Sequence, residues 1–202
     1  LIKTVQYDTI YHEHMRYYSL LSLDYLFKKY GLQIFFAKKI PTHGGSIRVY
    51  VSKSKKYKIH SSVKKILNYE KKFLTKKKFD KFKNDVVSSK INLYSLLKNL
   101  KKKNKLIFGV GAPSRAATLV NYVGLNEDII KYILEIKGSH KIGKYMPGTN
   151  IPIIDEKIIN KYKPDYLLLL SWHISKDLIK NFKKRGFKGK FIVPLPNPRI
   201  IS

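Results

Sequence analysis

Four consecutive side chains near the start of the chain could carry acid–base chemistry. Tyr11, His12, Glu13 and His14 bring together a phenol, a carboxylate and two imidazoles. Imidazoles exchange protons near neutral pH, so either histidine could act as a general base that the carboxylate orients. The alternative is a polar surface stretch without a chemical role. A zinc site is a weaker interpretation, because the two histidines lie two residues apart and the helical HExxH spacing is absent.

Two further segments contain candidate ligand contacts. His43 lies in a turn with two glycines, residues 42–46, which could form a hairpin or bring the backbone close to a ligand. Arg48 follows in a mostly apolar run. An arginine that points inward from a strand forms either a structural ion pair or an anion contact, and the sequence leaves both roles open.

A glycine-containing turn, residues 109–115, lies between an apolar run and a helical pattern. Ser114 is expected to cap the helix, whose amino end could bind a phosphate with Arg115 as an added cation. The dinucleotide fingerprint G-x-G-x-x-G is incomplete, because Ser114 occupies its third glycine position. An ordinary capped strand–helix turn explains the pattern slightly better.

The hydrophobic pattern predicts an α/β protein that positions these groups. A helix from Ser19 precedes two strands of a hairpin, 32–37 and 46–51. Residues 54–104 contain neither glycine nor proline, and their apolar spacing predicts a helical connector. Strands and helices then alternate from Lys105, which predicts a parallel, Rossmann-like sheet with right-handed crossovers. The expected strands lie within 106–110, 129–136, 166–170 and 191–193, and the expected helices at 114–122, 155–162 and 175–184.

Composition limits the class of protein. The 202 residues are 44% hydrophobic and 13% aromatic, enough for one large or two small folded domains. No apolar run approaches the roughly 20 residues of a membrane helix, and no signal peptide is visible. The absence of cysteine excludes disulfides and thiolate metal sites within this sequence. We therefore expect a cytoplasmic protein that does not bind a membrane, and the initial Leu1 indicates that the N-terminus is missing.

The net charge of +29 has two interpretations. A positive field attracts nucleic acid, yet arginine supplies only five of the 42 basic residues, and readers of phosphate and guanine usually rely on arginine. We favour compositional bias and expect no nucleic-acid partner. A nucleotide diphosphate would still be attracted by the field.

The candidate segments occur in an order and spacing that resemble one known family. They are Tyr7-Asp8-Thr9-Ile10-Tyr11-His12-Glu13-His14, residues 41–50, residues 109–115, Thr118-Leu119, Asn121-Tyr122, residues 141–153, Ser171-Trp172-His173-Ile174 and residues 189–196. The chain resembles the S-adenosylmethionine (SAM)-dependent C-methyltransferases of deoxysugar biosynthesis, which methylate a nucleotide-linked keto sugar.

The resemblance implies a domain organisation. Family members have a cysteine-ligated zinc domain, a SAM-binding Rossmann domain and a C-terminal Rossmann-like domain. Residues 1–52 would be the end of the class I methyltransferase sheet. Residues 53–202 would form the C-terminal domain, with helices at about 61–102 and an α/β region at 105–202. The zinc domain and most SAM contacts would precede Leu1, so we expect this fragment alone to be inactive.

The resemblance also implies roles for residues. The family removes a proton next to a ketone and methylates the enolate, which assigns the base to His14, supported by Tyr11 and Glu13. Tyr11 as the base is the alternative. No metal is expected in this chain, and we expect a monomer that binds a nucleotide-diphosphate sugar. Expected substrate contacts are His12, His43, Arg48, Gly111, Ser114, Arg115 and Lys141.

The sequence departs from the family at Ser114-Arg115, where a small residue and lysine are common, and at Glu135, where aspartate is common. These departures leave the nucleotide sugar open. The alternatives to an enzyme are a non-catalytic nucleotide-sugar-binding module and, less favoured, a lysine-rich nucleic-acid binder.

Overall fold

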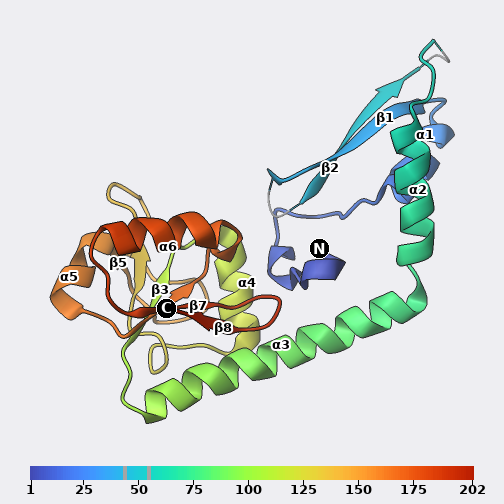
Figure 1. Ribbon diagram of the computed structural model, residues 1–202. Coiled ribbons are helices and arrows are strands. Elements are labelled where there is room, and N and C mark those ends of the chain that lie inside the picture. The colour runs from blue at the N-terminus through green and yellow to red at the C-terminus, as the bar shows by residue number, and fades with distance from the viewer. Residues whose placement is uncertain (43–44, 54–55) are drawn as a thin grey trace. The chain divides into compact units, whose positions relative to one another are not determined.

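The computed structural model describes residues 1–42, 45–53 and 56–202, which form two compact units (Figure 1). The first unit contains Leu1–Ile2 and His14–Lys83, and the second contains Lys3–Glu13 and Asn84–Ser202. The N-terminal segment of residues 3–13 therefore belongs to the same unit as the C-terminal half of the chain. Two short 3-10 helices begin the chain, η1 (Ile2–Thr4) and η2 (Tyr7–Thr9).

The first unit is a hairpin covered by two helices. Its elements are α1 (Leu20–Lys29), β1 (Gln33–Ile40), β2 (Ser46–Ser52) and α2 (Ser61–Phe73). The strands pair antiparallel, and the residues packed between them and the helices form a small apolar core. The carboxylate of Glu70 in α2 accepts a hydrogen bond of 2.9 Å from the amide of Leu21, which satisfies a free donor at the start of α1. The buried core residues are Leu20, Ile34, Ala37, Val63 and Ile66.

The long helix α3 (Lys76–Lys102) runs from the first unit into the second. Its lysine-rich first turns are exposed, as expected for a solvated face. In its second half one stripe is buried at helical spacing, which anchors this part of the helix in the second unit. The buried residues of the stripe are Ser89, Leu93, Leu97 and Leu100.

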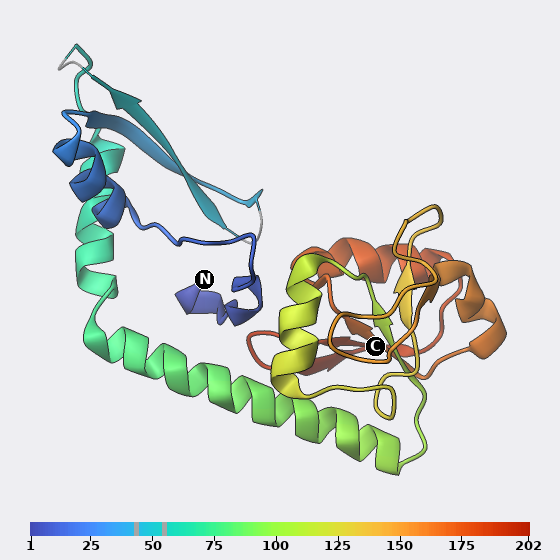
Figure 2. The ribbon, with the colours of Figure 1, turned by 180° about the vertical axis from the view of Figure 1, so that it is seen from behind.

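The second unit is built on a six-stranded, mostly parallel sheet, which confirms the predicted α/β fold. The strand order is β5-β4-β3-β6-β7-β8, and only the pairing of β7 with β8 is antiparallel. Figure 2 shows the same elements from behind. The strands are β3 (Ile107–Val110), β4 (Ile133–Glu135), β5 (Ile153–Asp155), β6 (Tyr166–Leu169), β7 (Lys190–Val193) and β8 (Arg199–Ile201).

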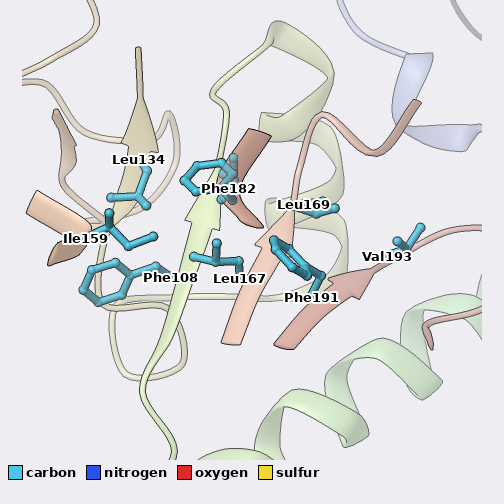
Figure 3. Packing of buried hydrophobic residues seen from close by; sticks show 9 residues of the cluster. Phe108, Leu134, Ile159, Leu167, Leu169, Phe182, Phe191 and Val193 are labelled. Carbon is cyan, nitrogen blue, oxygen red and sulfur yellow. The ribbon is translucent and has the colours of Figure 1, made fainter. Parts of the chain in front are cut away.

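Helices cover this sheet because its central strands are apolar on both faces. Every residue of β3 is buried, the pattern of a parallel strand with covered faces. On one face, side chains of β3, β6 and β7 pack with Ile159 and Phe182 (Figure 3). The helical elements are α4 (Ser114–Val123), η4 (Glu156–Ile158), α5 (Ile159–Tyr162), η5 (Trp172–Ile174) and α6 (Ser175–Lys184). In the described ranges, no helix combines the length and apolar character needed to cross a membrane.

The amino ends of β3 and β6 are joined by a carboxylate. Asp165 accepts hydrogen bonds from the amide of Leu106 at 2.8 Å and from the ammonium of Lys105 at 3.0 Å. The Leu106 amide above all, and then Lys105, hold the pKa of Asp165 below its ordinary value. The ionised form of this side chain is therefore favoured in the folded protein.

We expect Asp165→Asn to weaken the acid dependence of stability. A carboxylate with a lowered folded pKa stabilises the fold above its unfolded pKa of about 3.9, and this contribution is lost as pH falls through the folded pKa. The variant should be less stable than the wild type at pH 7, and the difference should narrow below about pH 4. Urea unfolding across this pH range measures it. Asp80→Asn, at an exposed position, is the control, and an undiminished difference at pH 2 to 3 would contradict the assignment.

Candidate functional site

In the second unit the chain passes from β3 to β4 on one side and from β6 to β7 on the other side. The strand order therefore reverses between the neighbouring strands β3 and β6. In doubly wound sheets, ligands bind at the carboxyl ends of the strands beside such a switch point. Here Val110 pairs with Leu169 at the end of the two strands. The loops that follow them begin at Gly111 and Leu170, so the candidate site lies among these loops.

The two loops approach closely at Gly111. Its φ is +81°, a left-handed conformation that favours glycine, and a Cβ atom there would overlap the hydroxyl of Ser171. The amides of Leu170 and Ser171 both donate to the carbonyl of Val110, at 3.0 and 3.3 Å. Backbone and side chain of the second loop therefore occupy the space beside Gly111.

We expect Gly111→Ala to destabilise the second unit by more than Gly124→Ala. Both glycines have nearly the same φ, +81° and +82°, but a Cβ at Gly124 meets no atom within 4 Å. The backbone penalty of about 1–2 kcal/mol should be common to both variants, and steric overlap should add about 1–3 kcal/mol at position 111 only. Urea unfolding of the two variants measures the difference. Equal losses would show that Ser171 moves aside without cost.

The switch point holds a buried carboxylate from the N-terminal segment. Asp8 accepts two hydrogen bonds of 2.8 Å from Arg115, through Nε and Nη2, and a third of 2.7 Å from the indole of Trp172. The guanidinium also lies over the indole ring, 5.0 Å from its centroid. Asp8 has no exposed surface, and Arg115 is 7% exposed. Arg115, predicted to contact the substrate, therefore forms an ion pair within the protein.

The segment around Asp8 lies along α4. The ring of Tyr7 packs against that of Tyr122, with centroids 5.0 Å apart, and the Thr118 hydroxyl donates to the carbonyl of Ile10 at 3.3 Å. Burial, and then the charge of Asp8, raise the pKa of Tyr7 above its ordinary value. Tyr7 is therefore a buried phenol and unsuited to act as a base.

The predicted acid–base cluster, residues 11–14, comes next along the chain after this segment. Tyr11, His12 and Glu13 lie in an irregular turn of the second unit, whereas His14 is the first residue of the next segment of the first unit. The imidazole of His12 is 3.9 Å from the Glu13 carboxylate, but both side chains are largely exposed, at 85% and 61%. The ring of His14 is 6.4 Å from that of Tyr17. The turn thus presents acid–base groups to solvent beside a firmly held segment.

The turn after β3 is stabilised by two charged side chains. The amide of Ala112 donates to the carboxylate of Glu135 at 2.7 Å, and the ammonium of Lys141 donates to the carbonyl of Ala112 at 2.7 Å. The predicted cap at Ser114 is wrong. Pro113 is the N-cap, because its fixed φ of −67° suits the extended cap position, and Ser114 is the first helical residue.

A hollow of about 200 Å³ lies at the amino end of α4. It brings together two predicted contact residues, Ser114 and Lys141, with Lys144 as a second cation. Helix amino ends and lysines both favour anions. A larger depression of about 460 Å³ is lined by Glu127 and neutral residues and contains none of the predicted contacts.

One remaining candidate, Arg48, lies on strand β2 of the first unit. The expectation that Arg48 points inward is wrong: it is exposed and lies opposite Lys38 on β1. Its neighbours Ile47 and Val49 pack on the core, so alternation along the strand turns Arg48 to the other face. His43 lies outside the described residues. Within those residues, histidine and acidic side chains form no group of three or more suited to a metal ion.

Comparison with known proteins identifies a family for this chain. Residues 41–196 match the family model described as the C-methyltransferase C-terminal domain. The chain is 32% identical over 208 aligned residues to the C-methyltransferase NovU of Streptomyces niveus. That alignment covers 100% of this chain and 49% of NovU, so the chain spans about half the length of this relative. The chain therefore belongs to the C-methyltransferase family and contains the C-terminal domain that characterises it.

Proposed function

We propose that the protein methylates the carbon next to the ketone of a nucleotide-linked keto-deoxysugar, with SAM as the methyl donor. The observation that carries the proposal is the exposed Tyr11–Glu13 turn, held at the switch point of a C-methyltransferase C-terminal domain. Such a turn can meet a substrate without rearrangement of the fold. The family supports methyl transfer to carbon, and carbon must first be made nucleophilic by loss of a proton.

In the proposed mechanism, His14 removes the proton from the carbon next to the ketone. The electrons of that C–H bond form the enolate, and Tyr11 donates a hydrogen bond to the developing enolate oxygen. Glu13 stabilises the imidazolium that results. SAM supplies an electrophilic methyl group on a sulfonium. The methyl group would pass from the sulfonium to the enolate carbon, and the proton would stay on His14 until solvent accepts it.

The turn after β3 does not fit SAM. The amide and the carbonyl of Ala112 are engaged by Glu135 and Lys141, and Ser171 occupies the approach to Gly111. A dinucleotide-type ligand would need this backbone to be free. We therefore propose that residues outside this chain bind the methyl donor, and that this chain contributes the base and contacts to the sugar nucleotide.

The hollow beside α4 is the proposed position of the nucleotide diphosphate. Ser114 and Lys144 line it together with Lys141, and the amino end of the helix adds favourable electrostatics for phosphate. The net charge of +29 increases the attraction of an anionic substrate. His12, His43, Arg48 and Gly111 remain proposed contacts, while Nε and Nη2 of Arg115 already donate to Asp8.

Solvent-deuterium exchange tests the proposal. A protein that joins this chain to its methyl-donor domain is incubated with a nucleotide-linked keto-deoxysugar in D₂O, first without SAM and then with it. We expect deuterium at the carbon next to the ketone without SAM, and a new C–CH₃ group with SAM. Binding of the sugar nucleotide without either reaction would instead identify a non-catalytic binding module. Salt-sensitive binding of random DNA with no sugar binding would favour the nucleic-acid alternative.

A further inference from the structure

The ligand position of the Rossmann-like sheet is occupied by the chain itself. Arg115 follows β3 and Trp172 follows β6, so the donors to Asp8 come from both sides of the switch point. Asp8 lies 107 residues before Arg115 and 164 before Trp172. A carboxylate therefore sits where sheets of this type ordinarily receive a phosphate or another anion.

The geometry of this contact favours orientation over stabilisation. A buried ion pair contributes little stability compared with apolar residues of similar size, because both charges lose their hydration. The fork of Arg115 and the indole N–H of Trp172 instead fix both carboxylate oxygens of Asp8 from two directions. The contact determines where residue 8 lies and how its backbone is turned.

Hydrogen bonds after Asp8 fix the backbone that leads from this residue to the Tyr11–Glu13 turn. After Asp8, the amide of Ile10 donates to the carbonyl of Tyr7 at 3.0 Å, and the amide of Tyr11 donates to that of Thr9 at 3.1 Å. The carbonyl of Ile10 is in turn held by the hydroxyl of Thr118. The backbone of Tyr11 is thus fixed three residues from the buried carboxylate.

We infer that Asp8, Arg115 and Trp172 form a clasp that docks the Tyr11–Glu13 turn on the second unit, and that Asp8 and Arg115 are positioning residues for the reaction. The docking is a property of the second unit alone. Its catalytic consequence rests on the proposed function.

Hydrogen–deuterium exchange of backbone amides tests the docking in the 202-residue chain. In Asp8→Asn, which keeps the size of the side chain, amides of residues 3–13 should exchange at least about tenfold faster, while those of β3 and β6 stay protected. Emission of Trp172, the single tryptophan, should shift because its indole loses a charged acceptor. Asp165→Asn is the matched control, since it breaks an ion pair at the opposite ends of the same two strands. Unchanged exchange of residues 3–13 in Asp8→Asn would overturn the clasp.

Kinetics test the positioning role. In the protein that joins this chain to its methyl-donor domain, with the keto-deoxysugar as substrate, Asp8→Asn should lower kcat for proton exchange by about 10–100-fold and leave KM within about twofold, since small displacements of catalytic groups cost this much. Asp165→Asn should leave both constants unchanged. If Asp8→Asn shows faster amide exchange in residues 3–13 but keeps the wild-type kcat, the positioning role is overturned. Absence of proton exchange in the wild type would refute the proposed function, while the amide-exchange result would still decide the docking.

Discussion

Replacing Arg115 with methionine should lower the free energy of unfolding of the second unit by about 3–5 kcal/mol, because it leaves one partner of a buried ion pair uncompensated. Asp8 has no exposed surface, and among the described residues the indole of Trp172 would be its remaining hydrogen-bond donor. Methionine fills much of the arginine volume, which limits the effect of a cavity. Urea unfolding followed by circular dichroism at pH 7 measures the loss.

Two variants define the origin of that loss. Asp8→Asn combined with Arg115→Met removes both charges, and it should recover part of the stability lost in Arg115→Met alone. Lys105→Met removes the cation of an ion pair whose side chains are 44% and 36% exposed, and its effect should be far smaller. An Arg115→Met loss no larger than that of Lys105→Met would contradict the description of a desolvated pair.

Replacing His14 with asparagine should lower kcat for methyl transfer by about 10²–10⁴-fold, the usual contribution of a general base. The proposed reaction breaks a weakly acidic C–H bond, and among the clustered groups an imidazole is best suited to accept that proton near neutral pH. Binding of SAM should be retained, since His14 is proposed to act on the methyl acceptor. Turnover and deuterium exchange into the sugar should fall together.

The matched controls for His14 lie in the turn that directly precedes it. His12→Asn removes the other imidazole and should change kcat far less. Tyr11→Phe removes the proposed donor to the enolate oxygen and should give an intermediate loss. If His14→Asn keeps near wild-type exchange and turnover while Tyr11→Phe abolishes both, the base is Tyr11.

The strands and helices around the switch point could be predicted from sequence. The apolar runs 106–110 and 166–170 became β3 and β6, each shorter by one residue, and the predicted helix 175–184 coincides with α6. The two central strands are continuous apolar runs because both of their faces are buried. The sequence of α6 alternates apolar and polar residues at helical spacing because the helix is amphipathic. Local sequence and tertiary packing favour the same structure there.

Two short strands that lack a strong sequence pattern, and depend on pairing with a neighbouring strand, were not predicted. β8 (Arg199–Ile201) is three residues long and forms only because β7 offers a free edge. The short strand β5 likewise depends on β4 as its neighbour. Within 129–136, only residues 133–135 form a strand, because pairing with β3 and β5 determines how much of the apolar run is extended.

The candidate site also has features that the sequence could predict and features that only the fold shows. Asp8 lies within the motif that revealed the acid–base turn, yet nothing local in the sequence shows that it is buried or that its partner is Arg115, 107 residues away. The orientation of Arg48 was available from the sequence, since the alternation of Ile47 and Val49 already placed it on the opposite face. A buried ionic contact between distant segments is a tertiary property and needs the fold.

In the second unit, the anion bound by Arg115 is a side chain of the same polypeptide, the carboxylate of Asp8. A tethered group has an effective concentration that free solutes must match, of the order of millimolar for short flexible links and greater where the link is ordered. Inorganic phosphate and free nucleotides would therefore displace Asp8 from the Arg115 fork poorly. We therefore expect the occupancy of this position to be independent of the concentration of such solutes, and the Tyr11–Glu13 turn to stay docked on the second unit.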